Sequence, residues 1–95
     1  MPHSTTTDVL VPLIQHADGV ATAFELSGDR FGAIHTLTAM EIGSTCLRAW
    51  TDSAIPEGTT ISLGFQDRNQ IAKRGAVTRC EHADSGYRLF IDFIG

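Results

Sequence analysis

Polar and apolar residues alternate over much of the chain, with the period of two that is typical of half-buried strands. Residues 87–93 place tyrosine, leucine, isoleucine and phenylalanine on one face, and residues 61–65 place isoleucine, leucine and phenylalanine on one face. Both segments are therefore predicted strands. Their apolar faces predict that the core contains Leu89, Ile91, Phe93, Ile61, Leu63 and Phe65.

Turn residues separate this pattern into short segments. A polar cluster with a glycine at residues 27–30 lies between apolar runs at 20–26 and 31–42, which predicts a hairpin. Further turns are expected at 55–58, 66–69 and 83–86, with another strand over 71–80. No segment has the pattern of a helix of about 12 residues or more. The chain is therefore predicted to be all-β, a small antiparallel barrel or sandwich, and closure is favoured because a small sheet must protect its edges.

The length of 95 residues suits one domain. We expect residues 1–17 to form a flexible or partly docked N-terminal segment, and residues 18–95 to form the barrel. The apolar run at 9–14 is too short to assign to a strand or a helix. No run approaches the roughly 18 apolar residues of a membrane span, and the first residues lack the features of a secretion signal. We expect no membrane span and a cytoplasmic protein.

No recognisable catalytic set or phosphate-binding glycine loop occurs in the sequence, so we expect a binding module and not an enzyme. Cys46 and Cys80 are widely spaced without a CxxC motif and are interpreted as reduced packing residues. The four histidines have no metal-ligand spacing, and we interpret them as exposed and inert; they are His3, His16, His35 and His82. No metal and no resident cofactor are expected.

The net charge is −4, which argues against general binding to nucleic acid because the phosphate backbone favours basic proteins. Arg30 is the only lysine or arginine among residues 1–47, and we interpret it as a solvated turn residue. The other basic residues lie in the second half of the chain. They form either a solvated outer face or, if their strands are neighbours, a surface for an anion or an acidic partner; these residues are Arg48, Lys73, Arg74, Arg79 and Arg88. The candidate partner-surface residues are Arg74, Arg79, Arg88 and Phe90. Trp50 and Phe90 are either packed against a terminal segment or exposed to a partner.

The order of elements from Glu41 to Phe93 resembles the PilZ domain. The shared features are a turn and strand at 41–49, the Pro56 and Gly58 turn before strand 61–65, the segment Gly75-Ala76-Val77-Thr78-Arg79, and the closing strand from Tyr87 to Phe93. The resemblance covers about 55 residues closely and residues 18–40 loosely. It implies a six-stranded antiparallel β-barrel, a bacterial signalling or motility pathway, and a site for cyclic diguanylate.

Two motifs carry that ligand in the family: RxxxR before the barrel, and D/N-x-S-x-x-G in an early turn. The sequence has no RxxxR, and the aligned turn has glutamate, glycine and cysteine in place of the acid, serine and glycine. Each arginine–phosphate hydrogen bond contributes about 1.5–3 kcal/mol, so their loss predicts an affinity lower by orders of magnitude. The degenerate ligand-binding positions are Glu41, Gly43, Cys46, Arg48 and Arg30.

Three functions follow as hypotheses. The first is a PilZ-like module that contacts another signalling or motility protein, with weak or absent cyclic diguanylate binding. The second is a noncanonical cyclic diguanylate receptor that uses Arg30, Arg48 and Glu41. The third, an unrelated oligonucleotide-binding barrel, is disfavoured by the acidic balance and the scarcity of aromatic residues. The partner and the oligomeric state are not specified by the sequence.

Overall fold

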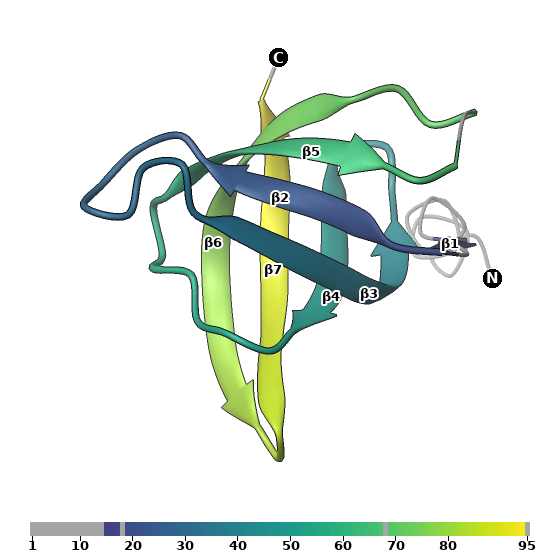
Figure 1. The fold of residues 1–95 in the computed structure, drawn as a ribbon. Helices are drawn as coiled ribbons and strands as arrows, with labels where there is room; N and C mark the ends of the chain where they lie inside the picture. Colours follow the sequence, from purple (N-terminus) through teal and green to yellow (C-terminus); the bar gives the residue numbers. More distant parts are fainter. Residues whose placement is uncertain (1–14, 18, 68, 95) are drawn as a thin grey trace, which may run out of the picture.

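The computed structural model describes residues 15–17, 19–67 and 69–94, and these form seven strands without a helix (Figure 1). In chain order the strands are β1 Gln15–Ala17, β2 Ala21–Glu25, β3 Ile34–Ile42, β4 Cys46–Thr51, β5 Thr60–Phe65, β6 Lys73–Ala83 and β7 Gly86–Ile94. All pairings are antiparallel. None of the described residues belongs to a helix that could cross a membrane.

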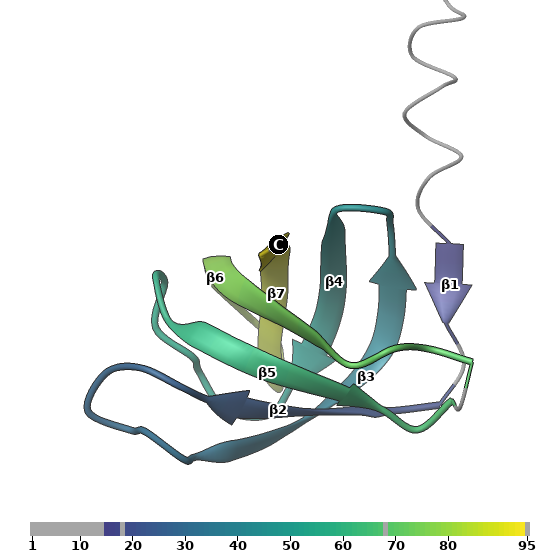
Figure 2. The same ribbon diagram turned by 90° about the horizontal axis from the view of Figure 1, so that it is seen from above.

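Six of these strands close into a barrel in the order β3, β2, β5, β6, β7, β4, and a β3–β4 pairing completes the ring. Seen from above in Figure 2, β4 and β7 lie opposite β2 and β5, and β3 curves from beside β2 to beside β4. The predicted six-stranded antiparallel barrel is therefore confirmed. The short β1 pairs with β3, so the last three residues of the expected N-terminal segment lie on the sheet. Residues 1–14, with His3 and the apolar run at 9–14, lie outside the described residues.

The predicted hairpin at 20–42 is present as β2 and β3, although β3 begins at Ile34. Residues 31–33 belong to the connecting loop, in which the Gly32 N–H donates to the Glu25 carbonyl oxygen at 2.7 Å. At the other end of the chain, β6 and β7 form a long hairpin around a two-residue turn. This hairpin extends beyond the other strands in Figure 1.

The core lies inside the barrel, where alternate residues of each strand point inward. Of the predicted core residues, Ile61, Leu63, Leu89 and Ile91 are at most 1% exposed. Phe65 and Phe93 are partly buried and pack against this core. The prediction is confirmed for the first four residues, and the two phenylalanines border the core because they lie near strand ends.

A β-bulge in β6 changes which residues face the core. Val77 pairs with Ile91 and Arg79 pairs with Phe90, so Thr78 is the extra residue on the bulged strand. Because one residue is inserted, Gly75 and Val77 point inward before the bulge, whereas Cys80 points inward after it. Arg79 is thereby directed to the outer face. This change of phase positions the candidate functional site.

Candidate functional site: an arginine and aromatic face

Five long side chains gather on the outer surface of β4, β6 and β7. Strand pairing places Arg48, Phe90 and Arg79 in one cross-strand row. The next row contains Trp50 and Arg88, followed by Glu81. These residues alternate with buried neighbours such as Leu89, so they point away from the core. We call Arg48, Trp50, Arg79, Arg88 and Phe90 the arginine-aromatic face.

Phe90 lies between two cations. The guanidinium carbon of Arg79 is 5.4 Å from the centre of the Phe90 ring, and that of Arg88 is 5.6 Å from it. Both distances are within the range of cation–π attraction. The ring therefore restrains two arginine side chains beside each other, which lowers the entropy that either would lose on binding an anionic partner.

The positive charges of this face are only partly compensated. Arg48 forms an ion pair with Glu41 at 2.7 Å, and Arg79 forms one with Glu81 at 2.8 Å. Arg88 contacts no carboxylate within ion-pair distance in the described part of the chain, and its guanidinium lies over the uncharged Phe90 ring. The face thus has an excess of one positive charge, located at Arg88.

A small cavity of about 190 Å³ lies beside this excess charge. It is lined by side chains of β3, β4 and β7, namely Ala39, Glu41, Arg48, Ala49, Trp50 and Arg88. The Nε of Arg48 is buried and has no hydrogen-bond partner among the described residues. A buried donor without an acceptor costs about 1–3 kcal/mol. A carboxylate that reached the Arg48 Nε–H after a shift of the arginine side chain would remove this cost.

The structure separates the other predicted site residues from this face. Gly43 lies in the β3–β4 turn and Cys46 begins β4, and the Gly43 N–H donates to the Cys46 carbonyl oxygen at 2.8 Å. Arg74 points outward from β6 but lies opposite Ile94, at the other end of the strand from Glu81. It lines a cavity with residues 44–45, 72–73 and 93–94. Of the nine predicted site residues, four lie in the arginine-aromatic face and Glu41 is paired with it.

Arg30 lies at the opposite end of β3 from Glu41. Ile34 begins β3 next to the loop that carries Arg30, and Glu41 is seven residues further along the strand. At about 3.3 Å per residue, this separation is on the order of 20 Å. Arg30 and the Glu41–Arg48 pair therefore do not line one small cavity.

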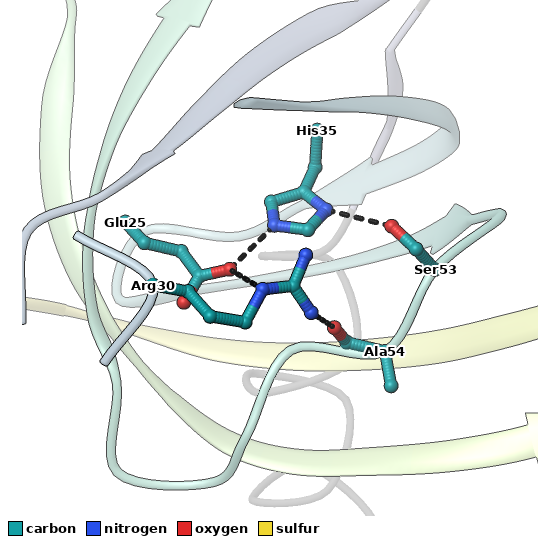
Figure 3. A network of polar contacts seen from close by, with 5 residues as sticks. All are labelled: Glu25, Arg30, His35, Ser53 and Ala54. Carbon is teal, nitrogen blue, oxygen red and sulfur yellow. Dashed lines mark hydrogen bonds and ion pairs between the residues drawn. The ribbon is translucent and has the colours of Figure 1, made fainter. Parts of the chain in front are cut away.

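Arg30 instead takes part in a polar network around the buried side chains of Glu25 and His35 (Figure 3). Its Nε lies 3.6 Å from Oε2 of Glu25, and its Nη1 donates to the Ala54 carbonyl oxygen at 3.2 Å. The same Glu25 oxygen lies 2.6 Å from Nε2 of His35, and Nδ1 of His35 lies 2.9 Å from the Ser53 hydroxyl oxygen. Arg30 lies in the loop between β2 and β3 with its side chain 49% exposed, as expected for a solvated turn residue. Its guanidinium also compensates the buried carboxylate of Glu25, which the sequence analysis did not predict.

His35 also differs from its interpretation as an exposed histidine. Its side chain is 1% exposed and that of Glu25 is 2% exposed, because both residues occupy inward positions of β3 and β2. This pair is the feature that the sequence analysis missed. The alternation gave a signal for it, since Glu25 follows Ala21 and Ala23 on one face and His35 precedes Leu37 on one face.

A serine, a histidine and a glutamate in series have the composition of a hydrolytic triad, but their surroundings favour a structural role. Imidazole and carboxylate are both enclosed, and the adjacent cavity of about 440 Å³ is lined by Glu25 and Arg30 rather than by His35 or Ser53. The network connects β2 and β3 to the loop after β4 through Ser53 and Ala54. It therefore holds this loop in place beside Ile55, which is part of the core.

Exposed apolar residues form a second surface group. Phe24 and Ile34 are cross-strand partners on β2 and β3, with exposed fractions of 41% and 62%, and Phe31 in the loop between them is 73% exposed. We call these three residues the β2–β3 apolar group. It carries no charge, in contrast to the arginine-aromatic face.

The cysteines and His82 lie outside these groups. His16 lies in β1, opposite Glu41 of β3. Cys46 and Cys80 are both free and half-buried, and Cys80 packs against the core. His82 is exposed near the end of β6, where its ring packs edge-on against Tyr87 at 5.1 Å between centroids. In the regions described, no three residues of the metal-ligating types lie close enough to hold an ion.

Comparisons with protein-family models, curated proteins and solved structures gave no match.

Proposed function

We propose that this chain is a PilZ-like binding module that performs no reaction and acts by contacting another protein of a bacterial signalling or motility pathway. The observation that carries the proposal is the arginine-aromatic face, in which Arg88 has no carboxylate partner among the described residues. Arginine and aromatic residues are the types that contribute most at protein interfaces. An acidic segment of the partner fits the excess positive charge. We place this interaction in the cytoplasm.

Weak or absent binding of cyclic diguanylate is part of the same proposal. Glu41 and Arg48 form an ion pair, and a ligand that uses either group must compete with the other. Arg30 is paired with Glu25 at the other end of β3. The resemblance supplies the expectation of a ligand site, and these contacts support a barrel that has lost it. The alternative function is the noncanonical receptor, which requires Arg48 to leave Glu41.

Affinity capture with matched variants tests the protein-contact proposal. The wild-type chain, Arg88→Glu and Arg74→Glu are immobilised and exposed to the same extract. The two variants carry the same charge change, and only the first alters the arginine-aromatic face. A partner retained by wild type and Arg74→Glu but lost from Arg88→Glu supports the proposal. Equal retention by all three proteins, or loss from Arg74→Glu alone, contradicts it.

A further inference from the structure

The outer half of β6 has an open edge. β5 pairs with β6 only along Lys73–Ala76, and the segment before β5 extends this contact to Val77. From Thr78 to Ala83, the described residues provide no strand on that side, whereas β7 continues along the other side to the hairpin turn (Figure 1). An open edge presents unpaired backbone groups that can pair with another strand.

The hydrogen-bonding phase identifies which groups face outward. The Phe93 N–H donates to the Thr45 carbonyl oxygen, on the β4 side of β7. Because backbone groups alternate between the two sides of a strand, odd-numbered residues of β7 bond toward β4. Even-numbered residues, including Arg88 and Phe90, therefore bond toward β6.

The partners of these residues on β6 are Glu81 for Arg88 and Arg79 for Phe90. Glu81 and Arg79 consequently direct their backbone N–H and C=O groups toward β7. Because backbone groups alternate along a strand, Cys80 and His82 direct their backbone N–H and C=O groups to the open edge. No described residue is hydrogen-bonded to these outward groups.

The charges beside this edge are self-complementary. Arg79 and Glu81 flank Cys80 on the outer face, with side chains 61% and 42% exposed. When two identical strands pair antiparallel with Cys80 opposite Cys80, each Arg79 faces the Glu81 of the other copy. Shifting the register by two residues in one direction places arginine opposite arginine, and in the other direction glutamate opposite glutamate. Opposite charges in cross-strand positions are stabilising and like charges are destabilising.

We propose that two copies of this chain associate by antiparallel pairing of their β6 edges, with Cys80 on the two-fold axis. Such an interface is isologous, because each copy uses the same residues. The two sheets become continuous through β6, and both arginine-aromatic faces lie on the same side of the joined sheet. This inference is independent of the proposed function, since the association needs no other protein.

Charge reversal and charge exchange test the register. Sedimentation equilibrium from about 10 μM to about 1 mM covers the range of a weak dimer. Glu81→Arg and Arg79→Glu each replace two attractive pairs by two repulsive ones, and should raise the dimer dissociation constant about tenfold or more. The exchange variant, with both changes together, restores complementarity and should return the constant to within about threefold of wild type. Arg74→Glu, away from the edge, should not change it.

Two results would overturn this proposal. The first is a wild-type chain that remains monomeric over the whole concentration range. The second is a dimer that is insensitive to the Arg79 and Glu81 reversals, or that is lost in Ile34→Asp, which would place the contact at the β2–β3 apolar group.

Backbone and thiol chemistry test the same interface without charges. His82→Pro removes an outward N–H and should abolish the dimer while the circular dichroism spectrum stays unchanged, whereas His82→Ala should keep the dimer.

Hydrogen-bonded antiparallel partners have Cα atoms about 5.5 Å apart, which a disulfide can span. Mild oxidation should therefore give a covalent dimer in Cys46→Ser and none in Cys80→Ser. A disulfide formed through Cys46 would overturn the register. So would a Cys46→Ser protein that associates but forms no disulfide.

Discussion

The imidazole Nε2 of His35 lies 2.6 Å from the carboxylate of Glu25, with both side chains enclosed by the barrel. A buried carboxylate needs compensating hydrogen bonds or charges, and here it has the imidazole and the Arg30 guanidinium. The pair joins the inner positions of β2 and β3, and Ser53 extends it to the following loop.

Removing the imidazole should destabilise the fold more than removing the hydroxyl. His35→Ala leaves a buried carboxylate and a cavity, and we expect the free energy of unfolding to fall by about 3–5 kcal/mol. Ser53→Ala removes one hydrogen bond and should cost about 1 kcal/mol. Urea denaturation at fixed pH measures both. The paired change of Glu25 and His35 to leucine should recover much of the loss, and a His35→Ala protein as stable as wild type would refute the structural role.

Gly75 lies on β6 opposite Phe93 of β7, where a side chain would meet the neighbouring strand. A Cβ at this position would lie 2.5 Å from Cγ2 of Ile91 and 3.0 Å from the Asp92 carbonyl oxygen. Gly75→Ala should therefore lower the free energy of unfolding by about 1–3 kcal/mol through overpacking. Gly64→Ala is the matched control, because nothing lies within 4 Å of its added Cβ. Thermal melts that rank the two variants equally would contradict the packing described for this strand pair.

Outward charges on β6 should contribute little to stability. Arg79 is 61% exposed, and its ion pair with Glu81 is a surface pair. Such pairs contribute about 0.2–1 kcal/mol. Arg74→Glu and Arg79→Glu should each shift the melting temperature by only a few degrees, measured at low protein concentration so that association does not contribute. A drop of many degrees in either variant would mean that the arginine carries a buried interaction.

The local pattern was sufficient for the strands but not for the site. The alternation at 61–65 and 87–93 predicted inward residues because the period of two is a property of each strand alone. The row of Arg48, Phe90 and Arg79 depends on the order β4, β7, β6 and on the bulge at Thr78. That order brings together residues from distant parts of the sequence, so no local pattern indicates it.

Burial of His35 also could not be derived from its own position in the sequence. An inward position of a strand is buried only when the sheet closes over it, and the same alternation places exposed residues at strand ends. The loop that contributes Ser53 and Ala54 completes the enclosure. A polar residue at an otherwise apolar position of the alternation is the sequence signal for such a buried pair. Whether the residue is buried depends on the strand that packs beside it.

Introducing the two ligand motifs of the PilZ pattern should raise the affinity of the chain for cyclic diguanylate. The graft combines an RxxxR before Val20 with Glu41→Asp, Gly43→Ser and Cys46→Gly. Two arginines supply charge-assisted hydrogen bonds of about 1.5–3 kcal/mol each, so binding of cyclic diguanylate should tighten by at least tenfold. The turn changes without RxxxR provide the control. A folded graft that binds no better than the native chain would place the alignment with the PilZ pattern in error.

The central claim is that this barrel acts without the ligand of the domain it resembles. Isothermal titration calorimetry of cyclic diguanylate into the wild-type chain, at physiological ionic strength, tests it most directly. We predict a dissociation constant no tighter than roughly 100 μM, which corresponds to about −5.5 kcal/mol, because Arg30 and Arg48 are paired with Glu25 and Glu41. A dissociation constant near about 1 μM that is lost in Arg30→Ala or Arg48→Ala would contradict the account and favour the noncanonical receptor.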